Sequence, residues 1–235
     1  RVLKKKLNIK KMWHTWTLDP LATGALLVAV WNYTKLIPYF EKDSKEYEFT
    51  VQLNGVTASY DSETDVEYIS EELQKKYEKE LTKEDIQKVI DNNFTGWIEQ
   101  IPPKYSALKI WGKKALDMVR SGEEFEMKKR KATIFDIEII KYSYPELTVR
   151  AKVSAGTYIR SIAFDLGEIL WTGGYISYLR RTKIDILDVK SAQILDDFDA
   201  EKSFSEINLF WKNKIITLDD VLIKRLNQGL VTNMK

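Results

Sequence analysis

Residues 132–153, ATIFDIEIIKYSYPELTVRAKV, decide the fold class of this chain. Apolar and polar residues alternate from Ala132 to Ile140 and again from Leu147 to Val153, which is the pattern of half-buried β-strands. Tyr144-Pro145 and Glu146 stand between the two runs, where a hairpin would turn. The stretch therefore predicts two strands paired directly, with no helix between them.

The segments around this hairpin mix further strands with helices. Tyr47 to Leu53 alternates like a strand and Ala25 to Val30 is a continuous apolar run, so we expect both in one sheet-based core. Helices are predicted over about residues 83–92, 113–120 and 158–171. Because regular strand–helix–strand alternation is lacking, we predict an α+β fold in which helices flank a mixed, mainly antiparallel sheet.

The first of these helices has the clearest start signal. Thr82 and Asp85 have the spacing of a capping box, and Ile86, Val89 and Ile90 then fall on one helical face.

Composition narrows the possible chemistry. The chain has 235 residues, no cysteine and one histidine, so disulfides and thiol chemistry are excluded and a protein-built zinc site is not expected. No apolar stretch approaches the roughly 20 residues of a membrane span. We expect a cytoplasmic protein with no membrane partner.

Charge is distributed unevenly, although the net charge is only +2. Basic residues gather in three runs, at residues 4–11, 128–131 and 180–183, and acidic residues concentrate between Asp61 and Asp91. Two interpretations remain open: a basic face for a phosphate backbone, or solvated surface lysines.

The segment HTWTLDPLATG, residues 14–24, carries the most informative pattern. Pro20 biases Asp19 towards an extended conformation in a rigid loop, and Gly24 frees the backbone before the apolar run. An aspartate placed in this way acts as a nucleophile or general base, or else caps a turn or helix. The residues alone leave both interpretations open.

This segment resembles the H-T-G-T-L-D-P-x-A-T-G signature of the bacterial TruB-type pseudouridine synthases. The resemblance continues along the chain in the order of the family motifs, through residues 32–36 (NYTKL), 45–47 (KEY), 101–109 (IPPKYSALK), 154–161 (SAGTYIRS) and 178–181 (YLRR). It implies the pseudouridine synthase fold with a central RNA-binding cleft. The implied activity is isomerisation of uridine 55 in the T loop of transfer RNA, without cofactor or metal.

The resemblance also implies roles for individual residues. Asp19 would be the catalytic carboxylate, Arg160 its ion-pair partner and Tyr47 the ring that stacks on the target base. The implied substrate-binding residues are His14, which would help open the T loop, Tyr158 beside the uracil ring, Leu179 lining the pocket, and Lys109 near the bound RNA. The expected partner is the T-arm stem-loop, bound by a monomer.

The implied reaction suits these residue types. The enzyme must break an N-glycosidic bond, rotate the detached uracil and rejoin it through carbon, so a carboxylate suffices. Flipping the uridine out of its stack costs a few kcal/mol, and stacking on Tyr47 can return about 1–3 kcal/mol.

Tryptophan is the main departure from the family pattern. Trp13, Trp16 and Trp31 stand where the pattern has glycine, Trp171 stands where a glycine helix cap is expected, and Trp111 occupies a usually small or polar position. Where the backbone needs a positive φ, a tryptophan meets a steric penalty of about 1–2 kcal/mol. We expect Trp16 to crowd the Asp19 loop and to slow turnover.

The domain organisation is a further expectation. Residues 1–212 are interpreted as the catalytic domain, without the family's N-terminal strand, and residues 213–235 as a C-terminal extension without a complete PUA domain.

Two alternatives to a working isomerase remain open. One is an RNA-binding module or tRNA-folding chaperone of the same fold with impaired catalysis, in which the tryptophans damage the Asp19 loop. The other is a carbohydrate hydrolase that pairs Asp19 with Asp165 or Glu168.

Overall fold

The computed structural model describes residues 2–40 and 44–199, which divide between two units of the fold. Within the described residues, the larger unit comprises 17–25 and 44–190, and the smaller one 2–16, 26–40 and 191–199.

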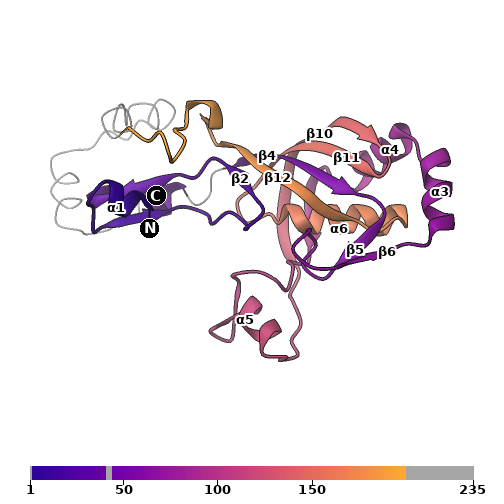
Figure 1. The fold of residues 1–235 in the computed structure, drawn as a ribbon, viewed down its shortest axis with the longest axis horizontal. Coiled ribbons are helices and arrows are strands. Elements are labelled where there is room, and N and C mark those ends of the chain that lie inside the picture. The colour runs from indigo at the N-terminus through magenta and orange to yellow at the C-terminus, as the bar shows by residue number, and fades with distance from the viewer. Residues whose placement is uncertain (1, 41–43, 200–235) are drawn as a thin grey trace. The chain divides into compact units, whose positions relative to one another are not determined.

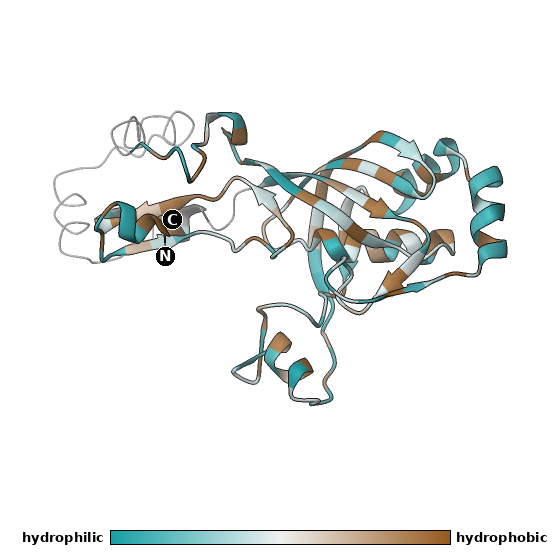
Figure 2. Cartoon of the chain, viewed as in Figure 1, coloured by the Kyte–Doolittle hydropathy of each residue, from teal (hydrophilic) through white to brown (hydrophobic). Residues whose placement is uncertain are grey.

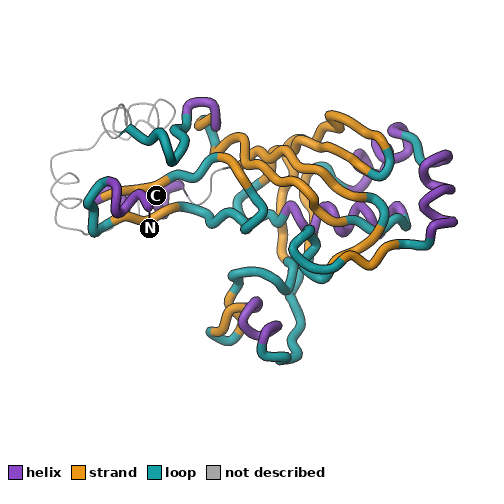
Figure 3. The backbone as a smooth tube through the Cα atoms, viewed as in Figure 1, coloured by secondary structure: helices purple, strands orange, loops and turns teal. Residues whose placement is uncertain are grey.

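A seven-stranded sheet forms the centre of the larger unit, and helices pack beside it (Figures 1 and 3). The elements of this unit are β2 (Thr23–Gly24), β4 (Lys45–Gln52), β5 (Gly55–Thr57), β6 (Val66–Tyr68), α3 (Glu71–Glu80), α4 (Lys83–Asn93), β7 (Gly96–Gln100), β8 (Lys109–Ile110), β9 (Lys113–Lys114), α5 (Ala115–Arg120), β10 (Arg130–Ser143), β11 (Glu146–Val153), α6 (Ile159–Leu170), β12 (Tyr175–Ile184), β13 (Leu187–Asp188) and most of the 3-10 helix η2 (Val189–Ser191).

The strand order of the sheet is β13-β12-β4-β11-β10-β7, with β2 paired to β12. All neighbours are antiparallel except β2 and β12, which are parallel. The sheet is therefore mixed and mainly antiparallel, as predicted.

One face of the sheet carries the hydrophobic core. Leu179, Phe49, Val149 and Ile139 form a cross-strand row over β12, β4, β11 and β10, and all four side chains are buried. Helices α4 and α6 contribute Ile86, Ile90, Ile162 and other residues to the same cluster. In contrast, α3 buries no residue and is hydrophilic along most of its surface (Figure 2).

The smaller unit contains a separate two-stranded sheet. Its elements are α1 (Val2–Lys6), β1 (Met12–His14), β3 (Val28–Val30), the 3-10 helix η1 (Trp31–Leu36) and α2 (Ile37–Phe40). Strands β1 and β3 pair antiparallel, with Met12 opposite Val30.

Most predicted elements are confirmed. Strands β10 and β11 form the expected hairpin, β4 covers the predicted strand from Tyr47, and α4 begins with the capping box of Thr82 and Asp85. Helix α6 begins at Ile159 and ends at Leu170, within the predicted range.

Two predictions were wrong in detail. The apolar run from Ala25 to Val30 does not join the main sheet, because Val28–Val30 pairs with β1 instead. The helix expected from Lys113 begins at Ala115, because Lys113 and Lys114 form β9.

The boundary predicted at residue 212 lies outside the described residues. No helix within the described ranges is long and apolar enough to cross a membrane.

Candidate active site

The Asp19 loop is fixed against strand β12 of the larger unit. The Ala22 amide donates to the Asp19 carbonyl oxygen at 2.9 Å, and the Ala25 amide donates to the Arg181 carbonyl oxygen at 2.9 Å. Gly24 adopts a φ of +104°, and a Cβ at this position would overlap the Arg181 backbone. Only glycine allows this close approach, which fixes the end of the Asp19 loop against β12.

Arg160 binds the Asp19 carboxylate through two hydrogen bonds. Nε donates to Oδ2 at 2.9 Å and Nη2 donates to Oδ1 at 3.0 Å, which is the bidentate geometry of a guanidinium with a carboxylate. Arg160 lies in the first turn of α6, and its side chain is only 4% exposed, whereas that of Asp19 is 33% exposed. The predicted pairing of Asp19 with Arg160 is confirmed by this geometry.

The remaining donors of Arg160 reach two backbone carbonyls. Nη1 donates to the Ser59 oxygen at 2.8 Å and Nη2 donates to the Tyr105 oxygen at 3.0 Å. The guanidinium thus connects the Asp19 loop with two other segments of the larger unit. Its plane and position are fixed from several sides, and so is the carboxylate that it holds.

Asp61 is a second carboxylate on Arg160, and the sequence analysis missed it. Its Oδ2 lies 3.3 Å from Arg160 Nη1, and its side chain is 1% exposed. Its Oδ1 accepts hydrogen bonds from the Ser59 hydroxyl at 2.6 Å and the Glu63 amide at 3.0 Å. Asp61 begins the acidic stretch noted in the sequence, but its side chain is buried and does not belong to an exposed acidic surface.

Glu63 is another acid near the Asp19 loop. Desolvation, followed by the nearby Asp61 carboxylate, raises the pKa of the Glu63 carboxyl, while Arg160 and a hydrogen bond from the Leu21 amide lower it. The sequence held no signal for either acid, because neither stands in a motif that we assigned.

Tyr47 projects from β4 on the core face of the sheet, beside Arg181 of β12. The two residues are register partners, and the Tyr47 ring packs against the hydrophobic core. Burial raises the pKa of the Tyr47 phenol, and Arg181 partly offsets this by charge and hydrogen bonding. The Asp19 charge also raises that pKa, which places Asp19 near Tyr47.

Arg181 was expected to contribute to a solvent-facing basic run, and that expectation was wrong. Arg181 is only 1% exposed, and its Nε donates to the Ala25 carbonyl oxygen at 2.7 Å. It supports the end of the Asp19 loop and the Tyr47 ring from inside the fold.

Tyr158 stands immediately before α6 and is held through its backbone. Its amide donates to Gln100 Oε1 at 2.6 Å, and its carbonyl accepts from Gln100 Nε2 at 3.3 Å. Burial raises the pKa of the Tyr158 phenol, Ser106 and the Arg130 charge partly offset this, and the nearby Asp19 charge raises the pKa by a smaller amount. Asp19, Arg160, Tyr47 and Tyr158 are therefore brought together.

The other predicted site residues are Leu179 and Lys109 in the larger unit and His14 in the smaller unit. Leu179 is buried in the core row beside Phe49, and Lys109 is exposed in the short β8–β9 hairpin. His14 belongs to the smaller unit, where its ring stacks on Trp13 with centroids 6.3 Å apart. Their substrate-binding roles remain predictions.

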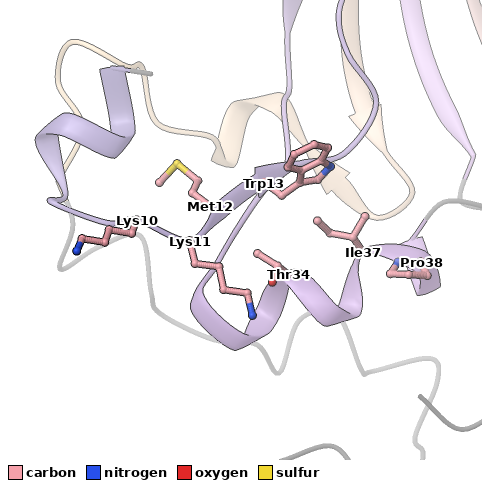
Figure 4. Close-up of a pocket in the computed structure, with 7 residues that line it drawn as sticks. All are labelled: Lys10, Lys11, Met12, Trp13, Thr34, Ile37 and Pro38. Atoms are coloured by element: carbon pink, nitrogen blue, oxygen red, sulfur yellow. The ribbon is translucent and has the colours of Figure 1, made fainter. Parts of the chain in front are cut away.

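A separate concavity lies in the smaller unit (Figure 4). It is lined by Lys10, Lys11, Met12, Trp13, Thr34, Ile37 and Pro38. These residues provide two cations and an apolar surface but no carboxylate. This concavity is therefore suited to contacts with an anion or a ring, and not to the chemistry expected of Asp19.

The site as a whole presents one oriented, partly exposed carboxylate on a buried cation. Such a group can attack an electrophilic carbon or accept a proton, and the two tyrosines beside it offer aromatic surface to a planar ring. A site of this kind can serve an enzyme that uses a carboxylate on a substrate with a planar ring.

The comparisons identify the family. A model described as TruB family pseudouridylate synthase (N terminal domain) matches residues 4–159. The chain therefore belongs to the TruB family of pseudouridylate synthases, as the motifs implied.

Relatives named tRNA pseudouridine synthase B extend this similarity over most of the chain. The one from Endomicrobium trichonymphae is 43% identical over 198 residues, covering 84% of this chain and 83% of the relative. The one from Bacteroides fragilis is 40% identical over 196 residues, covering 82% and 79%. The one from Aquifex aeolicus is 34% identical, covering 97% and 84%.

Solved structures agree on the fold. A chain of the crystal structure of a Cbf5-Nop10-Gar1 complex superposes with a TM-score of 0.60 at 26% identity, over 94% of this chain. A structure of an H/ACA RNP bound to a substrate RNA containing 2'-deoxyuridine gives a TM-score of 0.57 at 24% identity. The chain spans about half the length of these two chains, 53% and 51%.

Proposed function

We propose that this chain converts uridine 55 in the T loop of transfer RNA to pseudouridine, with Asp19 as the catalytic carboxylate. The observation that carries the proposal is the bidentate Arg160–Asp19 pair, held beside Tyr47 and Tyr158. The names of the relatives, which act on tRNA, support the choice of RNA. The T-arm stem-loop is the proposed partner, bound by a monomer in the cytoplasm.

The reaction conserves atoms. The N1–C1′ bond of uridine breaks, the uracil rotates, C5 bonds to C1′, the proton on C5 leaves to solvent and N1 takes up a proton. Asp19 attacks or assists while the base is detached, and its orientation matters because a displacement of about 1 Å costs on the order of a hundredfold in rate. Arg160 provides that orientation from a buried position.

Tyr47 and Tyr158 are proposed to hold the flipped base. Extruding the uridine from its stack costs a few kcal/mol, and each base stacked on an aromatic ring returns about 1–3 kcal/mol. A phenol with the ordinary pKa of 10 is protonated at neutral pH, and burial raises both pKa values further from neutrality. They therefore act as neutral aromatic surfaces, and Asp19 performs the chemistry.

The test is tritium release from C5-labelled uridine in a T-arm stem-loop, compared with a stem-loop in which cytidine replaces uridine 55. The wild-type chain should release tritium only from the first RNA. Asp19→Asn should lower single-turnover release by about four orders of magnitude, because an amide is a poor nucleophile. Arg160 keeps its ion pair with Asp61 in this variant, so the fold and RNA affinity should change little.

Asp136→Asn, an exposed position on β10, is the matched control and should behave like the wild type. Retained release by Asp19→Asn would refute the assignment of Asp19.

A second candidate is the RNA-binding module or tRNA-folding chaperone without catalysis. The observation on its side is Trp16, which stands three positions before Asp19 and has a φ of +40°, whereas the names of the relatives do not favour it. A wild-type chain that binds the stem-loop tightly but releases no tritium would decide for this candidate. Binding that weakens with salt is expected for both, since phosphate contacts release counterions.

A further inference from the structure

The tryptophans of this chain occupy backbone conformations that suit glycine. Six of the seven tryptophans lie in the described residues, and four of these six have positive φ: Trp16 at +40°, Trp31 at +48°, Trp111 at +51° and Trp171 at +61°. Of the nine described glycines, six have positive φ. The fraction of residues in the left-handed region is therefore the same for tryptophan as for glycine in the described part of this chain. A bulky side chain in this region is normally a steric outlier.

The other residues with positive φ have an evident reason for it. Within the described residues they are Asn8, Tyr60 and Asp185. Asparagine and aspartate tolerate this region, and the Tyr60 ring stacks on Phe164 with centroids 4.1 Å apart. The tryptophans at positions 111 and 171 have no comparable packing, because their residues are 83% and 82% exposed.

Two of the turns are types that select glycine by their geometry. Ile110 pairs with Lys113, so Trp111 and Gly112 form a two-residue hairpin loop in which both φ values are positive, +51° and +84°. Such loops prefer asparagine, aspartate or glycine. Trp171 ends α6 in the left-handed conformation and donates its amide to the Glu168 and Gly167 carbonyls, which is the usual place of a helix-terminating glycine.

Five of the six described tryptophan rings are also exposed, and only that of Trp16 is half-buried. Neither core cluster of the described residues contains a tryptophan, and Trp13, Trp31 and Trp97 are 65%, 50% and 78% exposed. Tryptophan is on average a highly buried residue. At Trp31, Trp111 and Trp171 a strained backbone carries an exposed ring, so burial of the ring does not offset the strain. Glycine, which has no side chain, would adopt these backbone conformations without strain.

We propose that the codon read as tryptophan in this chain is decoded as glycine in the cell that makes the protein. The proposal covers all tryptophan positions, because one codon assignment changes all of them together. It therefore includes Trp97, whose position in strand β7 does not require glycine, and Trp211, which lies outside the described residues. It also implies that the natural protein lacks the Trp13 ring in the concavity of Figure 4.

The decisive experiment is peptide mass spectrometry of the protein isolated from its own cells. Trypsin yields residues 12–35, with three of the positions, residues 89–104, with position 97 alone, and residues 132–141, with none. Glycine masses at 13, 16, 31 and 97, with an unchanged control peptide 132–141, are expected. A tryptophan mass at any of these four positions would overturn the proposal, and at position 97 it would do so even if the other three carried glycine.

A recombinant chain that carries tryptophan at every position tests the physical premise independently. Trp171→Gly should raise the thermal midpoint by roughly 2–4 °C, because glycine enters the left-handed region without a steric penalty. Trp97→Gly is the matched control and should give no rise, since its backbone is extended. A lowered midpoint for Trp171→Gly would remove the structural basis of the proposal.

Discussion

Two buried arginines of the larger unit, Arg160 and Arg181, lie beside opposite parts of the candidate site and act in different ways. Arg160 is 4% exposed and binds two carboxylates, Asp19 and Asp61, together with two backbone carbonyls. Arg181 is 1% exposed, donates to the Ala25 carbonyl and contacts Tyr47. The first holds the carboxylate that we propose to be catalytic, and the second holds the end of the Asp19 loop and the Tyr47 ring.

This difference follows from where each arginine lies. Arg160 is in the first turn of α6, where its side chain reaches the loops of residues 19, 61 and 105. Arg181 is in the middle of β12, between β4 and the parallel partner β2. Replacing either arginine should therefore affect different quantities: turnover for Arg160, and stability for Arg181.

The largest expected effect in this comparison is that of Arg160→Lys. Lysine retains the charge but cannot donate two parallel hydrogen bonds to the Asp19 carboxylate. We expect single-turnover pseudouridine formation to fall about a hundredfold to a thousandfold, with RNA affinity within a few fold. Arg150→Lys, at a partly exposed position on β11 where the arginine pairs with Glu48 and Glu138, is the control and should match the wild type. Equal turnover in both variants would refute the orienting role of Arg160.

Asp61→Asn tests whether the second carboxylate helps to position Arg160. The amide keeps an oxygen for Ser59 and Glu63 but places a neutral group against the guanidinium. The looser guanidinium should lower kcat by about tenfold to a hundredfold, with a smaller change in KM. Asp65→Asn, at an exposed position, should leave both constants unchanged. A purely structural role would lower the melting temperature but leave the kcat of the folded protein intact.

The two arginines also differ in how far the sequence predicted their surroundings. Patterns of alternation and capping predicted β4, β10, β11, α4 and α6, because these signals are local. The family motifs predicted the Arg160–Asp19 pair, although the two residues are 141 positions apart.

Burial of charge was not predictable in the same way. Asp61 and Arg181 look like surface charges in the sequence, since acidic and basic residues usually are. Only the tertiary fold brings Asp61 to Arg160 and buries Arg181. The prediction that Ala25–Val30 joins the main sheet was wrong for a related reason. Apolar character indicates burial but does not select the sheet that a strand joins.

Arg181→Lys should mainly lower stability. The lysine amine cannot reproduce the Nε bond to the Ala25 carbonyl together with the contact to Tyr47, and a buried carbonyl would lose its donor. We expect the free energy of unfolding in urea to fall by about 1–3 kcal/mol. Turnover at temperatures well below the transition should fall less than in Arg160→Lys. A larger loss of turnover than of stability would show that Arg181 takes part in the chemistry.

The smallest expected effect concerns Asp165, a carboxylate of α6 whose charged neighbour is another acid instead of an arginine. Burial, followed by the Glu168 charge, raises the pKa of Asp165 from 3.8 to about 6. Below pH 4 the group is protonated in both the folded and unfolded states. Between pH 4 and 6 the Asp165 carboxyl releases its proton in the unfolded chain but not in the folded one, so the free energy of unfolding falls as pH rises, and above pH 6 the full cost of the buried charge is present.

Asp165→Asn should therefore change the free energy of unfolding little at pH 4 and raise it by about 1 kcal/mol at pH 8, a figure reduced for solvent screening. Asp65→Asn should follow the wild-type curve at both pH values. A variant that is less stable at pH 8 than the wild type would mean that the Asp165 charge is held by the fold as the Asp19 and Asp61 charges are, and the contrast between carboxylates with and without a guanidinium would fail.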